Sequence, residues 1–143
     1  MAKNQKEIIE CVIYYNWVRH NKLDKFIYHI ANERNFNKKT ASKGYYEGNL
    51  LKKMGVKSGV LDYSIDRASN GYHGLKIEIK IKPNKLSQEQ KNQIKTLTDE
   101  GYLAIVCWSG QEAIDETMKY LNILHPHKQT LELEHQPDFL GEF

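Results

Sequence analysis

The sequence predicts an α/β domain in which helices pack around a mixed β-sheet. Two kinds of segment alternate along the 143 residues. Some are short and rich in β-branched and aromatic residues, whereas others are longer and preceded by residues that cap helices. No internal repeat, low-complexity tract or linker interrupts them. The resulting order, α-β-α-β-β-α-β-α, is that of a sheet covered by helices.

Each expected element has a recognisable start or stop. Thr40 and Ser87 are residue types that cap helix N-termini, and Gly55 and Gly101 are typical of helix ends. Asn70-Gly71 favours a tight turn between two strands. In chain order, we expect a largely buried helix at 5–20, a strand at 25–31, a helix at 40–54, strands at 59–66 and 74–82, a helix at 87–100, a buried strand at 102–108 and a helix at 111–121.

The periodic pattern is lost after Leu124, which predicts one domain at 1–124 and an acidic C-terminal tail at 125–143. No apolar run approaches the roughly 18 residues that span a bilayer, and no signal-peptide hydrophobic region is present. Cys11 and Cys107 lie in apolar runs, which favours buried free thiols. We therefore expect a cytoplasmic protein without a membrane partner.

Basic residues are concentrated in the middle of the chain. Residues 34–85 contain 12 Lys/Arg and 4 Asp/Glu, a balance of +8. The totals are 21 and 18, so the remainder has 9 basic and 14 acidic residues, a balance of −5. A basic centre between acidic ends is compatible with a phosphate-binding surface, although solvated lysines give the same composition.

Asp62 in one expected strand and Glu78-Ile79-Lys80 in the next carry the most chemical information. Residues two apart on a strand point to the same face, about 6.6 Å apart, so Glu78 and Lys80 point together. Pairing of the two strands can bring Asp62 against Glu78. The intervening side chains are expected to point to the core on the opposite face, namely Ile77, Ile79 and Ile81.

Two carboxylates about 5 Å apart repel by roughly 3 kcal/mol at an effective dielectric of 20. A divalent cation removes this repulsion, and hard oxygen ligands favour Mg²⁺ or Mn²⁺. Such an ion activates a water molecule and polarises a phosphodiester, while Lys80 can orient the water or stabilise developing charge. The backbone carbonyl of Ile79 can complete the coordination. The alternative is an exposed hairpin with alternating charges, on which a Glu-x-Lys pattern is also common.

Residues 52–121 resemble the virus-type replication-repair nuclease (VRR-NUC) domain, a branch of the PD-(D/E)XK nuclease superfamily. Segments 29–32 and 39–41 look like the first strand and following loop of that family. The motifs occur in the family's order and spacing. The matching residues are Gly55, Val56, Gly59, Val60, Asp62, residues 71–75 and 77–80, Leu86, Ser87, Gln90, Gly101, Tyr102, Val106, Cys107, Glu112 and Ala113.

The resemblance implies a restriction-endonuclease-like αβββαβ core and phosphodiester hydrolysis with Mg²⁺ or Mn²⁺. By position, Asp62 and Glu78 are metal ligands and Lys80 is the catalytic lysine. Gln90 matches a family position that points at the site. Leu61 replaces the usual proline before the first acid, which affects strand conformation rather than chemistry.

The resemblance also implies an acidic residue on the first helix that supports or binds the metal. Glu10 matches this position, and Glu7 competes with it. The residues expected to contact DNA are basic side chains and one residue of the 67–73 tip. A plain flexible hairpin without DNA contacts is the alternative interpretation of that tip. They are Lys39, Lys57, His73, Lys82 and Lys85.

Other binding chemistries are poorly supported. MGVKSG at 54–59 lacks the P-loop pattern, so no nucleotide cofactor is expected. His125, His127 and His135 have no neighbouring cysteines with which to form a zinc site.

The sequence thus favours a structure-selective DNA endonuclease. By resemblance to stand-alone family members, it is a homodimer that cuts branched DNA such as four-way (Holliday) junctions. A monomeric flap or end-processing nuclease and a non-catalytic DNA-binding module are the alternatives.

Overall fold

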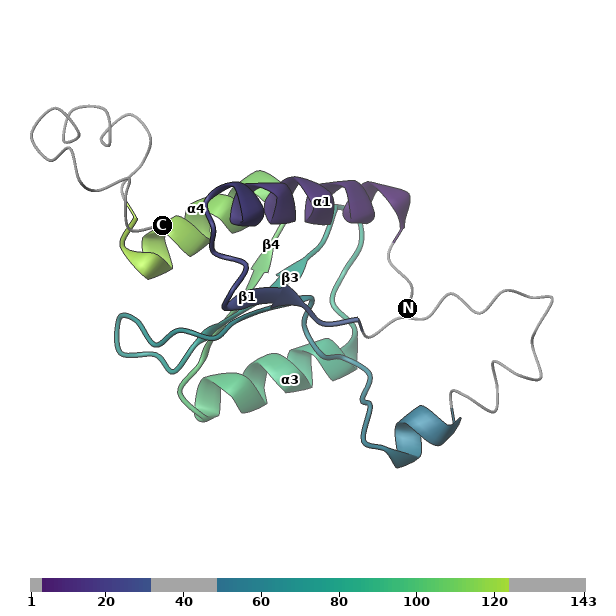
Figure 1. Ribbon diagram of the computed structural model, residues 1–143. Helices are drawn as coiled ribbons and strands as arrows, with labels where there is room; N and C mark the ends of the chain where they lie inside the picture. Colours follow the sequence, from purple (N-terminus) through teal and green to yellow (C-terminus); the bar gives the residue numbers. More distant parts are fainter. Residues whose placement is uncertain (1–3, 32–48, 124–143) are drawn as a thin grey trace, which may run out of the picture.

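The computed structural model describes residues 4–31 and 49–123. Within these ranges, α1 and α4 cover one face of a four-stranded sheet and α3 covers the other (Figure 1). The elements are α1 (Gln5–His20), β1 (Ile27–His29), β2 (Tyr63–Ile65), β3 (Leu75–Ile79), α3 (Gln88–Asp99), β4 (Leu103–Cys107) and α4 (Gly110–Leu121). No helix in the described ranges is long and apolar enough to cross a membrane.

The sheet is mixed, as predicted. Its order is β1-β2-β3-β4, with antiparallel pairing from β1 to β3 and parallel pairing between β3 and β4. A parallel pair requires a crossover connection, which α3 supplies across one face. The α/β architecture predicted from the alternating segments is therefore confirmed.

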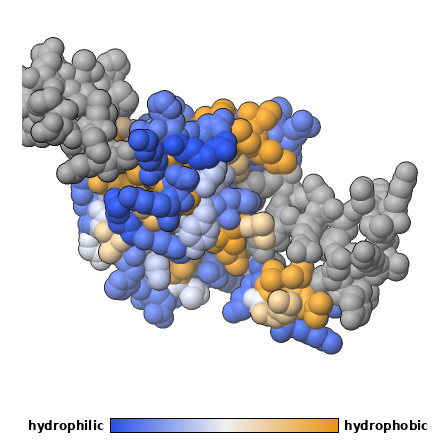
Figure 2. Space-filling view, viewed as in Figure 1, coloured by the Kyte–Doolittle hydropathy of each residue, from blue (hydrophilic) through white to orange (hydrophobic). Residues whose placement is uncertain are grey.

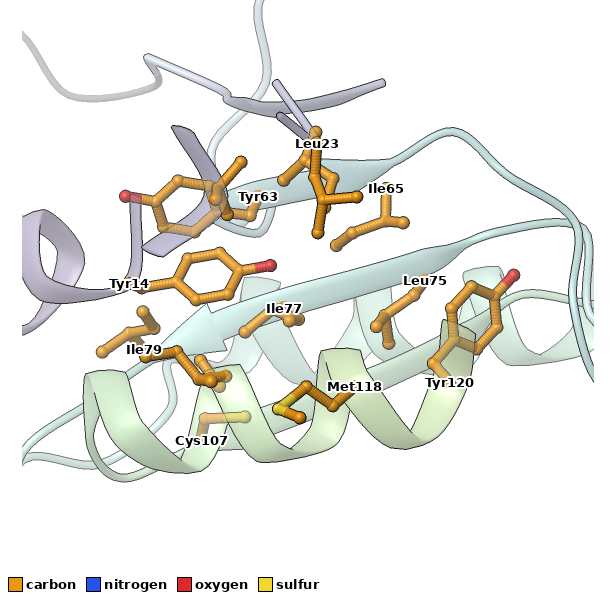
Figure 3. Close-up of a cluster of buried hydrophobic side chains, with 14 of the residues drawn as sticks. Tyr14, Leu23, Tyr63, Ile65, Leu75, Ile77, Ile79, Cys107, Met118 and Tyr120 are labelled. Carbon is orange, nitrogen blue, oxygen red and sulfur yellow. The ribbon is translucent and has the colours of Figure 1, made fainter. Parts of the chain in front are cut away.

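The register of β2 and β3 divides their side chains between two environments. Tyr63 pairs with Ile77, and Ile65 pairs with Leu75. These residues are buried, and they contribute to the core that lies between the sheet and the α1–α4 layer (Figure 3). Polar residues occupy the alternating positions, which face the α3 side.

Helix α1 begins after Asn4, whose side chain accepts a hydrogen bond from the Glu7 backbone N–H at 2.9 Å. Its bounds match the prediction, but the expectation of a largely buried helix was wrong. Only one face is buried, comprising Glu7, Cys11, Tyr14 and Val18. The sequence is apolar around most of the helix, so periodicity did not reveal that its other face is exposed.

Tyr14 contacts α4 from α1. Its ring is fully buried, and its hydroxyl lies 2.9 Å from the Thr117 hydroxyl. The Thr117 hydroxyl also bonds the Ala113 carbonyl one turn earlier in α4 at 2.7 Å. Satisfying these buried hydroxyls keeps the cost of burying them low.

Helix α3 begins at the predicted cap. Ser87 accepts from the Gln90 backbone N–H at 3.1 Å, and the Gln90 side chain accepts from the Ser87 N–H at 2.9 Å. This reciprocal pair is a capping box. None of the helix residues is fully buried, so α3 covers the sheet loosely.

Strand β4 was expected to be buried, which is correct for Cys107 only. Leu103, Ala104, Ile105 and Val106 are partly exposed. The reason is positional, because β4 is the last strand of the sheet formed by the described residues. An apolar run alone does not distinguish such an edge strand from a central one.

The 67–73 tip forms a tight turn, as Asn70-Gly71 predicts. Both residues have positive φ, at 52° and 81°. The tip is not a plain projecting hairpin, because Ser69 donates to the Tyr120 carbonyl at 2.6 Å and Asn70 donates to it at 3.0 Å. The last turn of α4 therefore holds the tip in place.

Most of the predicted helix at 40–54 lies outside the described residues. Of its described part, residues 49–53 are helical. Its expected stop is present: the Gly55 N–H bonds the Lys52 carbonyl, and the Val56 N–H bonds the Leu51 carbonyl, both at 3.0 Å. The 125–143 tail also lies outside the described residues. Ile81, expected in the core, is partly exposed because β3 has ended at Ile79.

We predict that Gly59→Ala lowers the free energy of unfolding more than Gly55→Ala. Both glycines have positive φ, at +83° and +100°. A side chain in such a conformation costs about 1–2 kcal/mol. At Gly59 a Cβ atom would also lie 2.6 Å from the Glu89 carbonyl carbon, whereas at Gly55 it would meet nothing within 4 Å. Urea denaturation measures both losses, and equal losses would contradict this close approach of α3.

Candidate active site

Asp62 directly precedes β2 and Glu78 lies on the adjacent strand β3, and both face the α3 side of the sheet. Tyr63 pairs with Ile77, so continuing the register by one residue sets Asp62 opposite Glu78. One Asp62 carboxylate oxygen accepts a hydrogen bond from the Ile79 backbone N–H at 2.8 Å. Asp62 is 8% exposed and Glu78 is 2% exposed. Two acidic side chains are thus buried side by side.

Lys80 and Gln90 both contact the same oxygen of Glu78. The Lys80 ammonium nitrogen lies 3.5 Å from Glu78 Oε1, and Gln90 Nε2 donates to it at 2.8 Å. The lysine is well sheltered, with 12% of its side chain exposed. Asp62, Glu78 and Lys80 therefore form one cluster, which we call the acidic centre.

Gln90 links this centre to the start of α3. Its Oε1 atom completes the capping box with Ser87, while its Nε2 atom reaches Glu78. A glutamate would serve the capping box equally well, but it has no amide to donate to a carboxylate. The choice of glutamine is therefore explained by the contact with Glu78.

The acidic centre suits a divalent cation. Two carboxylates and one ammonium group leave a formal charge of −1 in a largely buried place. Carboxylate oxygens, together with the nearby Ile79 carbonyl, are the ligands that Mg²⁺ and Mn²⁺ prefer. Among the described residues, no group of three or more His, Cys, Asp or Glu side chains is placed to hold a metal.

Glu7 is the carboxylate of α1 that reaches the segment after Lys80. It is buried, and its Oε1 atom accepts from Asn84 Nδ2 at 2.8 Å and from the Ile81 N–H at 3.4 Å. It therefore fixes the backbone where β3 leaves the sheet. No sequence signal singled out Asn84.

Glu10 has a different place. One of its carboxylate oxygens accepts from the Gly110 backbone N–H at 2.6 Å, at the start of α4. A carboxylate is favourable there because helix N-termini have exposed N–H groups and positive potential. Glu10 thus contacts the start of α4, whereas Glu7 contacts the segment that follows Lys80, and the role of either residue in supporting a metal stays a prediction.

The expected DNA contacts are dispersed. Lys82 and Lys85 lie on the exposed segment after β3, and Lys57 lies on the exposed loop before β2. His73 lies before β3, at the strand end opposite to Lys80, with its ring 5.8 Å from that of Tyr102. Lys39 lies outside the described residues.

A second polar cluster extends along the same face of the sheet. Lys76 donates to the buried Ser64 hydroxyl at 2.6 Å and lies 3.7 Å from Asp66. Ser64 in turn donates to Asp66, and this bond lowers the pKa of the Asp66 carboxyl. The alternating positions of β2 and β3 were the sequence signal for this cluster, but only Asp62, Glu78 and Lys80 had been singled out.

Cys11 and Cys107 are buried free thiols, as predicted. Burial raises the pKa of Cys107 to about 12, and the nearby Glu112 and Glu116 carboxylates add to this shift. The thiolate, which is the reactive form, is therefore scarce at neutral pH. Cys107 is not suited to be a nucleophile.

No family model and no curated protein matches the sequence. Among solved structures, the chain is similar to one described as a VRR_NUC domain protein, with 30% sequence identity and a TM-score of 0.69. The similarity covers 85% of this chain and 93% of the other. The chain therefore belongs to the virus-type replication-repair nuclease family and forms a restriction-endonuclease-like nuclease domain.

Proposed function

We propose that the protein is a metal-dependent, structure-selective DNA endonuclease that hydrolyses phosphodiester bonds in branched DNA, such as four-way junctions. The observation that carries this proposal is the buried acidic centre, in which Asp62 and Glu78 lie on paired strands and Lys80 contacts Glu78. Burying two carboxylates next to each other costs folding free energy. Such costly arrangements are concentrated at binding and catalytic sites.

In this proposal, the side chains of Asp62 and Glu78 and the backbone carbonyl of Ile79 hold Mg²⁺ or Mn²⁺. These residues would hold the ion, whose chemistry when bound would be to activate a water molecule and polarise the phosphodiester. Gln90 keeps Glu78 oriented through its amide, and the Ile79 N–H orients Asp62. Groups fixed in this way lose little entropy when substrate binds.

Lys80 is the group we assign to charge stabilisation. Its ammonium lies on the side of the sheet to which both carboxylates point, so it can contact a phosphate oxygen or orient the attacking water. Glu7 and Asn84 fix the backbone that follows it. Lys57, Lys82 and Lys85 are proposed to contact flanking phosphates, which would make binding strongly dependent on salt.

We further propose that the protein acts as a homodimer through α1. Four large apolar side chains on this helix are between 43% and 52% exposed: Ile8, Ile9, Val12 and Ile13. In Figure 2, hydrophobic atoms gather at the top of the view, where Figure 1 places α1. A two-fold pair would bury these apolar faces against each other and present two centres to a symmetric junction.

Sedimentation velocity tests the dimer. Wild type is expected to sediment as a dimer and Val12→Glu as a monomer, because the new charge would be buried in the interface. Thr96→Glu is the matched control, since it adds the same side chain on the exposed face of α3. A monomeric wild type would contradict the dimer and would favour a flap or end-processing nuclease.

Cleavage assays test the acidic centre. Labelled four-way junction, flap, duplex and single strand are incubated with Mg²⁺ or Mn²⁺. We expect the junction to be cut best, and Lys80→Ala to slow cleavage by at least about a hundredfold. Binding in EDTA should survive this substitution. Lys95→Ala, which removes an exposed lysine from α3, should cleave like wild type.

Two outcomes would overturn the proposal. Cleavage by Lys80→Ala at the wild-type rate would remove Lys80 from the centre. Absence of cleavage of every substrate by wild type with either metal would favour a non-catalytic DNA-binding module.

A further inference from the structure

Trp108 is a partly exposed aromatic residue that directly follows β4, just as Lys80 directly follows β3. The parallel register pairs Ile79 with Cys107, so the chain leaves both strands together at Lys80 and Trp108. The Lys80 N–H also bonds the Cys107 carbonyl at 2.9 Å. The indole is 38% exposed. A large aromatic surface is thus presented beside the acidic centre.

The backbone around Trp108 is fixed by three hydrogen bonds. The Trp108 N–H donates to Glu112 at 2.7 Å, and the Ser109 hydroxyl accepts from the Glu112 N–H at 3.0 Å. The Gly110 N–H donates to Glu10 at 2.6 Å. The Glu10 carboxylate therefore helps to fix the turn that carries the Trp108 indole. An aromatic residue on such a turn loses little entropy when it contacts a ligand.

A basic side chain accompanies the indole. The Lys82 ammonium lies 5.7 Å from the centre of the Trp108 ring. An aromatic face next to a cation is the combination with which proteins bind single-stranded nucleic acids, because bases stack on the ring while the cation contacts the backbone. The other tryptophan, Trp17, instead packs against the core.

A single exposed aromatic residue is common on protein surfaces and needs no function. Three features distinguish Trp108: its place one residue beyond the strand pair that carries Lys80, its fixed backbone, and its contact with Lys82. The first of these matters most, because only a sugar separates the base of a nucleotide from its phosphate, so a base can reach Trp108 while its phosphate contacts Lys80.

We propose that Trp108 stacks on a nucleobase that has an exposed face next to the phosphate held at the acidic centre, while Lys82 contacts a neighbouring phosphate. This inference rests on the proposed nuclease function and specifies its substrate. In continuous duplex both faces of each base are already stacked, and exposing one costs a few kcal/mol. The preferred substrate is therefore DNA in which stacking is interrupted at the cut site, as at the open centre of a branch point or in a single-stranded arm.

Fluorescence provides the first test. The sequence contains two tryptophans, so Trp17→Phe leaves Trp108 as the only one. This variant also carries Lys80→Ala and is titrated in EDTA, which separates binding from cleavage. An oligothymidylate should quench the emission, whereas a blunt duplex should bind with little quenching. Equal emission changes with the two DNAs, or quenching with neither of them, would overturn the stacking proposal.

Affinity provides the second test, in the Lys80→Ala background with both tryptophans. Trp108→Ala should weaken binding of the oligothymidylate by about tenfold, and Trp108→Phe should weaken it less. Binding of the blunt duplex should be unchanged in both variants, with circular dichroism showing that they are folded. Equal weakening for both DNAs, or weakening for neither, would contradict the inference while leaving the nuclease function intact. Failure of the parent protein to bind any DNA would overturn both proposals.

Discussion

The pairing of β2 with β3 determines where every other part of the proposed site must lie. With Tyr63 opposite Ile77, odd-numbered residues of both strands enter the core and even-numbered residues face α3. A shift of one residue would turn the carboxylates toward the apolar core and the isoleucines toward α3. The apolar face thus maintains the register, and the register places Asp62 against Glu78. Stability and site geometry have the same origin here.

Helix α1 fixes the two segments that follow the C-terminal ends of β3 and β4, where the proposed chemistry occurs. Glu7 bonds the segment after β3, and Glu10, one turn later, bonds the turn after β4. The two strands end side by side, so both carboxylates of one helix hold the chain where Lys80 and Trp108 emerge. Carboxylates that accept backbone N–H bonds are strong anchors because the interaction is charge-assisted. In this account both acids of α1 act through the backbone.

The sequence predicted most of the fold, and it predicted the acidic centre, because both depend on local patterns. Alternation placed Glu78 and Lys80 on one face, and Ser87 and Gly55 marked helix ends that the structure retains. Other features depended on tertiary contacts that no local pattern encodes. The buried face of α1 was hidden by apolar residues on nearly all sides, so the burial of Glu7 was not predicted. The edge position of β4 was likewise not readable from its apolar run.

The claim on which the account depends is that Asp62 and Glu78 bind one divalent cation together. Anomalous diffraction from crystals soaked in Mn²⁺ tests it directly. We predict an anomalous peak in contact with both carboxylates, and its loss in crystals of Asp62→Asn. A peak elsewhere with none at this position, or a peak that persists unchanged in Asp62→Asn, would contradict the account.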